Sequence, residues 1–132
     1  MGIFNNLFKS NTEVEKDKKI NWLPLTESSP LEAIISASKT KPMLIFKHST
    51  RCGISRMVLK SFERNYNLED TAIDLYFLDL LNFRALSNQI SKKLNVYHQS
   101  PQILVIKNEQ VIYHDSHYSI SIDAIKEVLE NN

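Results

Sequence analysis

The stretch from residue 43 to residue 62 changes its hydrophobic pattern once, at a polar turn that holds the only cysteine of the chain. Met43–Phe46 is a short, continuous apolar run, which is typical of a buried strand. After the turn, apolar side chains recur with helical spacing at Ile54, Met57, Val58 and Phe62. Cys52 is therefore expected in the first turn of a helix, where unpaired N–H groups and the helix dipole favour an anion. A thiol at such a place loses its proton more easily, and the thiolate is the nucleophile.

Strand and helix patterns alternate along the rest of the chain. Strands are predicted at residues 22–25, 43–46, 73–81, 103–106 and 111–113, and helices at 29–41, after Cys52, at 82–94 and at 122–130. The run at 73–81 is almost entirely apolar, as in a parallel strand that is covered on both faces. Alternating strands and helices imply βαβ crossovers, and the last two strands form an antiparallel hairpin. The sequence thus predicts an α/β protein whose mixed central sheet, a parallel core plus a C-terminal antiparallel hairpin, is flanked by helices.

Residues that favour helix starts precede the first three predicted helices. Ser29 is a candidate N-cap, with Pro30 at the first helical position and Glu32 at the capping-box position. Thr50 and Asn82 are the corresponding N-cap candidates for the next two helices.

The chain of 132 residues is long enough for one domain with an ordinary core. Residues 1–20 are mostly polar and of mixed charge, and are interpreted as a flexible lead-in to a domain over residues 21–132. The formal net charge of +1 gives no argument for nucleic acid or an anionic membrane as a partner. No apolar run approaches the roughly 20 residues of a membrane helix, and no signal peptide is recognisable. A cytoplasmic protein is therefore expected.

A lone cysteine is most often a small buried hydrophobic residue. Here its neighbours, Arg51 and Gly53, lie in a polar turn and argue against burial. Gly53 is one of only two glycines in the chain, and a glycine beside a cysteine lets another molecule approach the sulfur closely. Without a second cysteine, Cys52 forms no disulfide within the chain, so any exchange must pass through a partner thiol.

The order of elements resembles the thioredoxin fold. Cys52 follows the strand that opens the central βαβ unit, and Ser55 stands where a Cys-x-x-Cys pair has its second cysteine. Ser100-Pro101 precedes the late hairpin, where thioredoxin-like proteins keep a cis-proline facing the nucleophilic sulfur. More closely, the chain resembles the monothiol bacilliredoxin family. The matching segments are His48–Cys52, Ile54-Ser55, Asp79-Leu80, His98–Gln102 and His114–His117, whereas Gly53 replaces the proline that the family usually has after the cysteine.

This resemblance implies a thiol–disulfide oxidoreductase that removes bacillithiol from S-bacillithiolated client proteins. Cys52 would form a mixed disulfide with bacillithiol, and bacillithiol or another external reductant would regenerate it. Bacillithiol is then a thiol co-substrate of a monomeric protein that holds no tightly bound cofactor. Two alternatives stay open. Cys-Gly-x-Ser is also the monothiol glutaredoxin pattern, so Cys52 could ligate an iron–sulfur cluster or act in a redox-sensing adaptor. The third alternative is an inert binding module with a thioredoxin fold.

The catalytic candidates are Cys52 as the nucleophile and Ser55 as a hydrogen-bond donor to its thiolate. The predicted substrate-binding residues flank the cysteine or lie in the two later loops: Arg51, Gly53, Ile54, Arg56, Gln99, Ser100, Pro101, Ser116 and His117. Arg56, Lys60 and Arg64 recur every four residues and form a basic stripe, either a solvated face or an attraction for an acidic ligand. The four histidines have no metal-site spacing, and no metal site is predicted.

Overall fold

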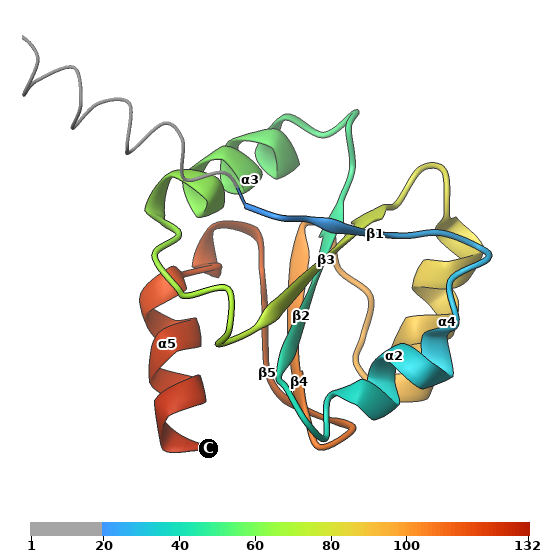
Figure 1. The fold of residues 1–132 in the computed structure, drawn as a ribbon. Coiled ribbons are helices and arrows are strands. Elements are labelled where there is room, and N and C mark those ends of the chain that lie inside the picture. Colours follow the sequence, from blue (N-terminus) through green and yellow to red (C-terminus); the bar gives the residue numbers. More distant parts are fainter. Residues whose placement is uncertain (1–19) are drawn as a thin grey trace, which may run out of the picture.

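Residues 20–132, which the computed structural model describes, form a five-stranded mixed sheet with helices on both sides (Figure 1). The strands are β1 (Leu23–Leu25), β2 (Met43–His48), β3 (Asp74–Asp79), β4 (Gln102–Lys107) and β5 (Gln110–Ser116). The helices are α2 (Leu31–Ala37), α3 (Gly53–Asn65), α4 (Arg84–Leu94) and α5 (Ile122–Asn131), with a 3₁₀ turn η1 (His117–Ser119) before α5. All but the last residue of the predicted lead-in, 1–20, lies outside the described residues.

The sheet has the order β1-β3-β2-β4-β5. β3 is parallel to both β1 and β2, whereas β4 is antiparallel to β2 and β5 is antiparallel to β4. The predicted fold, a parallel core with a C-terminal antiparallel hairpin, is confirmed. β3 is covered on both faces, since Leu75 and Leu78 belong to different core clusters.

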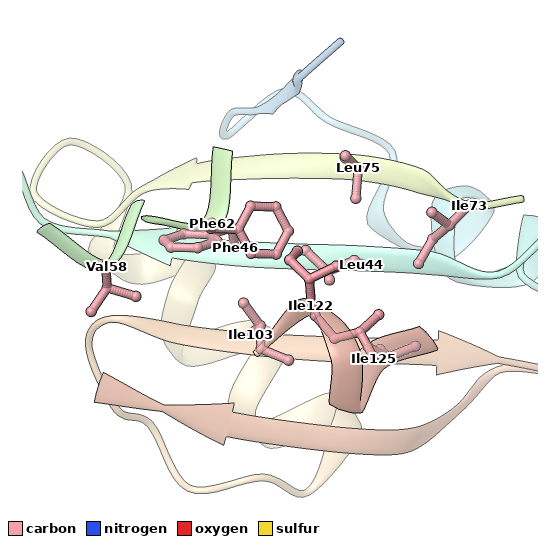
Figure 2. Packing of buried hydrophobic residues seen from close by; sticks show 10 residues of the cluster. Leu44, Phe46, Val58, Phe62, Ile73, Leu75, Ile103, Ile122 and Ile125 are labelled. Carbon is pink, nitrogen blue, oxygen red and sulfur yellow. The ribbon is translucent and has the colours of Figure 1, made fainter. Parts of the chain in front are cut away.

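Successive side chains of β2 point to opposite faces of the sheet, and each face has its own helices. Leu44 and Phe46 pack with α3 and α5, the pair of helices on one side of the sheet in Figure 1. Figure 2 shows this core, in which Phe62 of α3 lies against Phe46 with 5.3 Å between ring centroids. Met43 and Ile45 face the other side, where they pack with α4. The strand that leads to Cys52 is therefore fixed from both faces.

The hairpin between β4 and β5 turns without glycine. Its two central residues, Asn108 and Glu109, have φ values of 53° and 65°. Positive φ at both positions is typical of the type I′ turn, whose twist matches that of the flanking strands. The last strand, predicted at residues 111–113, is longer than predicted. β5 continues to Ser116 because residues 114–116 pair with the first half of β4.

The three predicted N-caps are wrong, and for Ser29 and Asn82 the reason is that neighbouring polar groups hold their side chains. Ser29 accepts a hydrogen bond from the Thr26 N–H, and α2 begins after Pro30 and ends at Ala37, earlier than predicted. Asn82 donates to Asp79, and the N-cap of α4 is Phe83. The N-cap of α3 is Cys52, not Thr50, and within residues 20–132 no side-chain hydrogen bond caps that helix.

Candidate active site around Cys52

Cys52 lies between the end of β2 and the first residue of α3. Its N–H donates to the Ser49 carbonyl at 3.2 Å, and its own carbonyl accepts from the Arg56 N–H at 3.1 Å as the first bond of the helix. The thiol is partly exposed and unpaired. The predicted strand-to-helix turn is thus confirmed, with Cys52 as the N-cap, immediately before the helical residues, instead of within the first turn. The side chain that the sequence marks as nucleophilic is open to a partner.

Ser55, the other catalytic candidate, is fully buried in the first turn of α3. Its hydroxyl accepts from the Ser49 N–H at 3.0 Å and pairs with His48 Nδ1 at 2.8 Å. The hydroxyl therefore ties the start of α3 to the end of β2, and no hydrogen bond to Cys52 is among its contacts within residues 20–132. Its predicted donation to the thiolate stays a prediction.

His48 is a site neighbour to which sequence reasoning gave no role. Its side chain is buried on the α3 side of the sheet, with its ring 5.5 Å from that of Phe77. Burial lowers the pKa of His48 below its usual range, against an opposing attraction from Asp79, its partner in the β2–β3 register. Side chains alternate between the two faces of the sheet along β2, which places His48 on the same face as Leu44 and Phe46. This alternation is the sequence signal that could have indicated the burial of His48.

The loop before β4 and the end of β5 meet at the same edge of the sheet. The Ser100-Pro101 peptide bond is cis, as predicted, and the Pro101 carbonyl accepts from the His117 N–H at 3.0 Å. Gln102, the next residue, lies between Lys47 of β2 and Ser116 of β5 in the sheet. η1 also contacts α3. The fold thus brings Pro101, Ser116 and His117 to the end of the sheet from which the Cys52 turn departs.

The remaining predicted substrate-binding residues fall into two groups. Arg51, Gly53, Ile54 and Arg56 are exposed at the Cys52 turn and the start of α3. A Cβ atom added at Gly53 would meet no atom of residues 20–132 within 4 Å, apart from its two chain neighbours, so the space at Gly53 itself is open. Across from them, Gln99 is exposed and Ser100 is half-buried in the loop before Pro101. The Ser100 hydroxyl has no hydrogen-bond partner within residues 20–132.

Ile54 and Met57 share the helical spacing of Val58 and Phe62 but do not belong to the core. They are 39% and 63% exposed, whereas Val58 and Phe62 are buried. The buried face of α3 passes through Ser55 instead, so two apolar side chains are left at the surface beside Cys52.

Lys47 is an unpredicted buried cation next to the site. The side chain is fully buried on the α4 side of the sheet, where no carboxylate forms an ion pair with it among residues 20–132. Its ammonium donates to Ser91 Oγ at 2.9 Å and to the Ser87 carbonyl at 3.3 Å. Burial lowers the pKa of Lys47 from 10.5 to about 8. Burying a charge that has only neutral hydrogen-bond partners costs free energy of folding. The stability of the protein should therefore depend on whether Lys47 is protonated.

His98 connects this buried cation to the loop before Pro101. Its Nδ1 lies 3.5 Å from Lys47 Nζ and 3.2 Å from Ser87 Oγ. Burial lowers the pKa of His98, and the charges of Lys47 and Arg84 lower it further. A neutral His98 can accept a hydrogen bond from the Lys47 ammonium. His98 thus anchors the loop before Pro101 to β2 through Lys47 and to α4 through Ser87. Gln102 adds a second anchor by donating to the Tyr97 carbonyl at 2.7 Å.

Within residues 20–132 there is no group of three or more His, Cys, Asp or Glu side chains able to hold a metal ion. None of the helices in that range combines the length and the apolar character that crossing a membrane requires.

Comparison with known proteins gives one family and one fold. A family model described as monothiol bacilliredoxin BrxC matches residues 23–125. Among solved structures, a candidate oxidoreductase with a thioredoxin fold is 27% identical, with a TM-score of 0.68 over 86% of this chain and 96% of that one.

Two thioredoxins of known structure are more distant in sequence but share the fold. The thioredoxin of Malassezia sympodialis is 14% identical, with a TM-score of 0.63 over 86% of this chain and 92% of that one. The thioredoxin of Schistosoma mansoni is 17% identical, with a TM-score of 0.60 over 86% and 95% of the two chains.

Proposed function

Because the chain belongs to the monothiol bacilliredoxin family, a thiol redox family with a thioredoxin-like oxidoreductase fold, we propose that it removes bacillithiol from S-bacillithiolated proteins in the cytoplasm. One observation carries this proposal: a single partly exposed thiol begins α3, beside open space at Gly53. A thiol with these surroundings can attack a disulfide that a partner brings to it.

The exchange runs in two balanced steps. The Cys52 thiolate attacks the bacillithiol sulfur of the client's mixed disulfide, a Cys52–bacillithiol bond forms, and the client leaves as a thiolate that takes a proton from solvent. A second thiolate, from bacillithiol or another reductant, then attacks the bound bacillithiol sulfur and releases Cys52. No electrons enter or leave beyond those of the thiols, and no resolving cysteine of this chain takes part.

The bacillithiol group would lie between the two groups of predicted binding residues. Arg51 and Arg56 are exposed cations next to Cys52 and suit the carboxylates of its malate part. Ser116 and His117 supply polar groups on the opposite side, together with the Gln99–Pro101 loop. The hydrogen bond from the His117 N–H to the Pro101 carbonyl supports this arrangement, because it joins the two loops into one wall.

The family function is tested by substrate preference. One test protein with a single cysteine is converted into its bacillithiol and its glutathione mixed disulfide, and turnover of the two is compared under a common reductant. We expect faster release from the bacillithiol form, since only that ligand carries the malate carboxylates. Equal or better use of the glutathione form would contradict the assignment. A brown protein with visible absorbance after purification would favour the cluster-binding alternative, which rests on the Cys52-Gly53-Ile54-Ser55 pattern.

The proposed wall is tested by replacing Ser116 and His117 together with alanine. Bacillithiol-dependent exchange is expected to slow about tenfold or more, since losing one hydrogen bond to a charged ligand costs roughly 1.5–3 kcal/mol. The alkylation rate of Cys52 by iodoacetamide is expected to stay unchanged, because neither side chain bonds to the thiol. Unaltered exchange kinetics in this variant would show that the segment only leads into α5.

A further inference from the structure

Positive charge is concentrated on the segment that begins at Arg51, the residue before Cys52. Residues 51–65 contain four of the 16 Lys and Arg residues of the chain but only one of its 15 Asp and Glu residues. That one acid, Glu63, accepts a hydrogen bond from Trp22 Nε1 at 2.9 Å. The first turn of α3 contains no acidic residue. A chain of nearly balanced charge therefore has a local basic surface at its nucleophile.

The cations of α3 lie on one side of the helix. Arg56, Lys60 and Arg64 are spaced by four residues and are all exposed, whereas the opposite side of the helix is buried. Ion pairs within residues 20–132 join Lys39 to Glu109, Lys41 to Asp74 and Lys93 to Glu32, so none of them neutralises this stripe. The charges are available to a partner.

Exposed apolar side chains accompany the cations. Ile54 and Met57 of α3 are on the surface, and so is Tyr118 of η1, the turn that contacts α3. Methionine, tyrosine and arginine are enriched in protein interfaces. We use "basic face" for Ile54, Arg56, Met57, Lys60 and Arg64.

The length of the basic face indicates the size of its partner. With a rise of about 1.5 Å per residue, Lys60 and Arg64 lie about 12 Å and about 18 Å along the helix from Cys52. A low-molecular-weight thiol that is joined to Cys52 contacts the first turn and leaves Arg64 untouched. In an exchange reaction at Cys52, the far end of the face can therefore contact only a partner of macromolecular size.

We propose that the basic face docks a protein partner with an acidic surface, which presents its disulfide to Cys52. The partner's carboxylates pair with Arg56, Lys60 and Arg64. Ile54 and Met57 contact an apolar side chain of the same partner. The proposal rests on thiol exchange at Cys52 and not on the identity of bacillithiol as the released thiol. Charge complementarity of this kind acts chiefly on the rate of association.

Two peptides that differ only in charge test the proposal without bacillithiol. Each contains one cysteine as a thiopyridyl disulfide, flanked by glutamates in one peptide and by lysines in the other. Cys52 attacks the peptide sulfur, a Cys52–peptide disulfide forms, and thiopyridine leaves and is followed by its absorbance. At low salt we expect the acidic peptide to react about tenfold faster or more, because steering raises association rates by about 10–1,000-fold. The ratio should fall toward one at about 1 M salt, where screening is nearly complete.

A matched pair of variants locates the effect. Arg64 and Lys92 are both exposed cations in the last turn of a helix, α3 and α4 respectively. Arg64→Glu, alone or with Lys60→Glu, should slow the acidic peptide several-fold and speed the basic one, whereas Lys92→Glu should change neither by more than about twofold. Reaction with dithiodipyridine, an uncharged small disulfide, should be the same in all variants.

Equal rates for the two peptides, or equal effects of Arg64→Glu and Lys92→Glu, would overturn the proposal. The proposal would also be overturned if the protein bound vesicles of anionic phosphatidylglycerol at the same salt concentration but reacted equally fast with the two peptides. Failure of bacillithiol turnover with a retained peptide preference would instead contradict only the proposed function.

Discussion

Replacing Cys52 by serine is expected to reduce thiol exchange to the rate seen in buffer without protein. A serine hydroxyl is a weak nucleophile unless an adjacent base activates it, and no side chain hydrogen-bonds to residue 52 among the described contacts. Ser55 gives no substitute, because its hydroxyl is buried and bound to His48 and Ser49. The measurement is single-turnover release of thiopyridine from an activated peptide disulfide.

The control for this variant is Ser55→Ala, which separates the nucleophile from the buried hydroxyl. It leaves the Ser49 N–H and His48 Nδ1 without their partner, so we expect a loss of about 1–3 kcal/mol in the free energy of unfolding. The thiol of Cys52 remains, and with it the attack on the peptide disulfide. A Cys52→Ser protein that keeps exchange activity would refute the thiol mechanism. A Ser55→Ala protein that is folded but inactive would assign Ser55 a direct role in the reaction.

The second large effect is expected from Lys47 and concerns the dependence of stability on pH. The pKa of Lys47 is lowered from 10.5 to about 8 by burial, so the folded protein releases this proton at a lower pH than the unfolded chain does. Between these values the unfolded state binds more protons, and stability therefore rises with pH. Across the whole window the gain approaches about 3 kcal/mol, since each pKa unit corresponds to about 1.4 kcal/mol.

Lys47→Met should abolish this rise, because methionine occupies a similar volume without a charge. Urea unfolding of the two proteins at about pH 7 and about pH 10, followed by Trp22 fluorescence, gives the difference. Burial raises the pKa of Tyr66 and of Tyr113 to about 12, and these groups oppose the rise at the alkaline end equally in both proteins. An exposed control, Lys92→Met, should leave the pH dependence as in the wild type. Parallel curves for wild type and Lys47→Met would mean that water reaches the amine.

The local pattern of the sequence determined the order of the elements and the place of the nucleophile. Apolar runs and helical spacing depend on residues that are near neighbours in the chain, so β2, the turn at Cys52 and α3 could be predicted directly. The cis form of the Ser100-Pro101 bond was expected from the resemblance to thioredoxin-like proteins, which have a cis-proline before this strand. Helix starts were less predictable, because Ser29 and Asn82 use their side chains on neighbouring turns instead of capping.

The surroundings of the nucleophile depend on contacts between distant parts of the chain. Three contacts near Cys52 depend on which strands become neighbours in the sheet. They are the hydrogen bonds between Ser55 and His48, between Lys47 and Ser91, and between His117 and Pro101. The Lys47–His98 contact spans 51 residues, and β4 lies beside β2 although α3, β3 and α4 separate them in the chain. Periodicity tells which face of an element is apolar. Periodicity alone does not predict that Ile54 and Met57 of α3 are exposed to solvent. Whether a side chain is buried depends on the neighbours that pack against it in the folded protein.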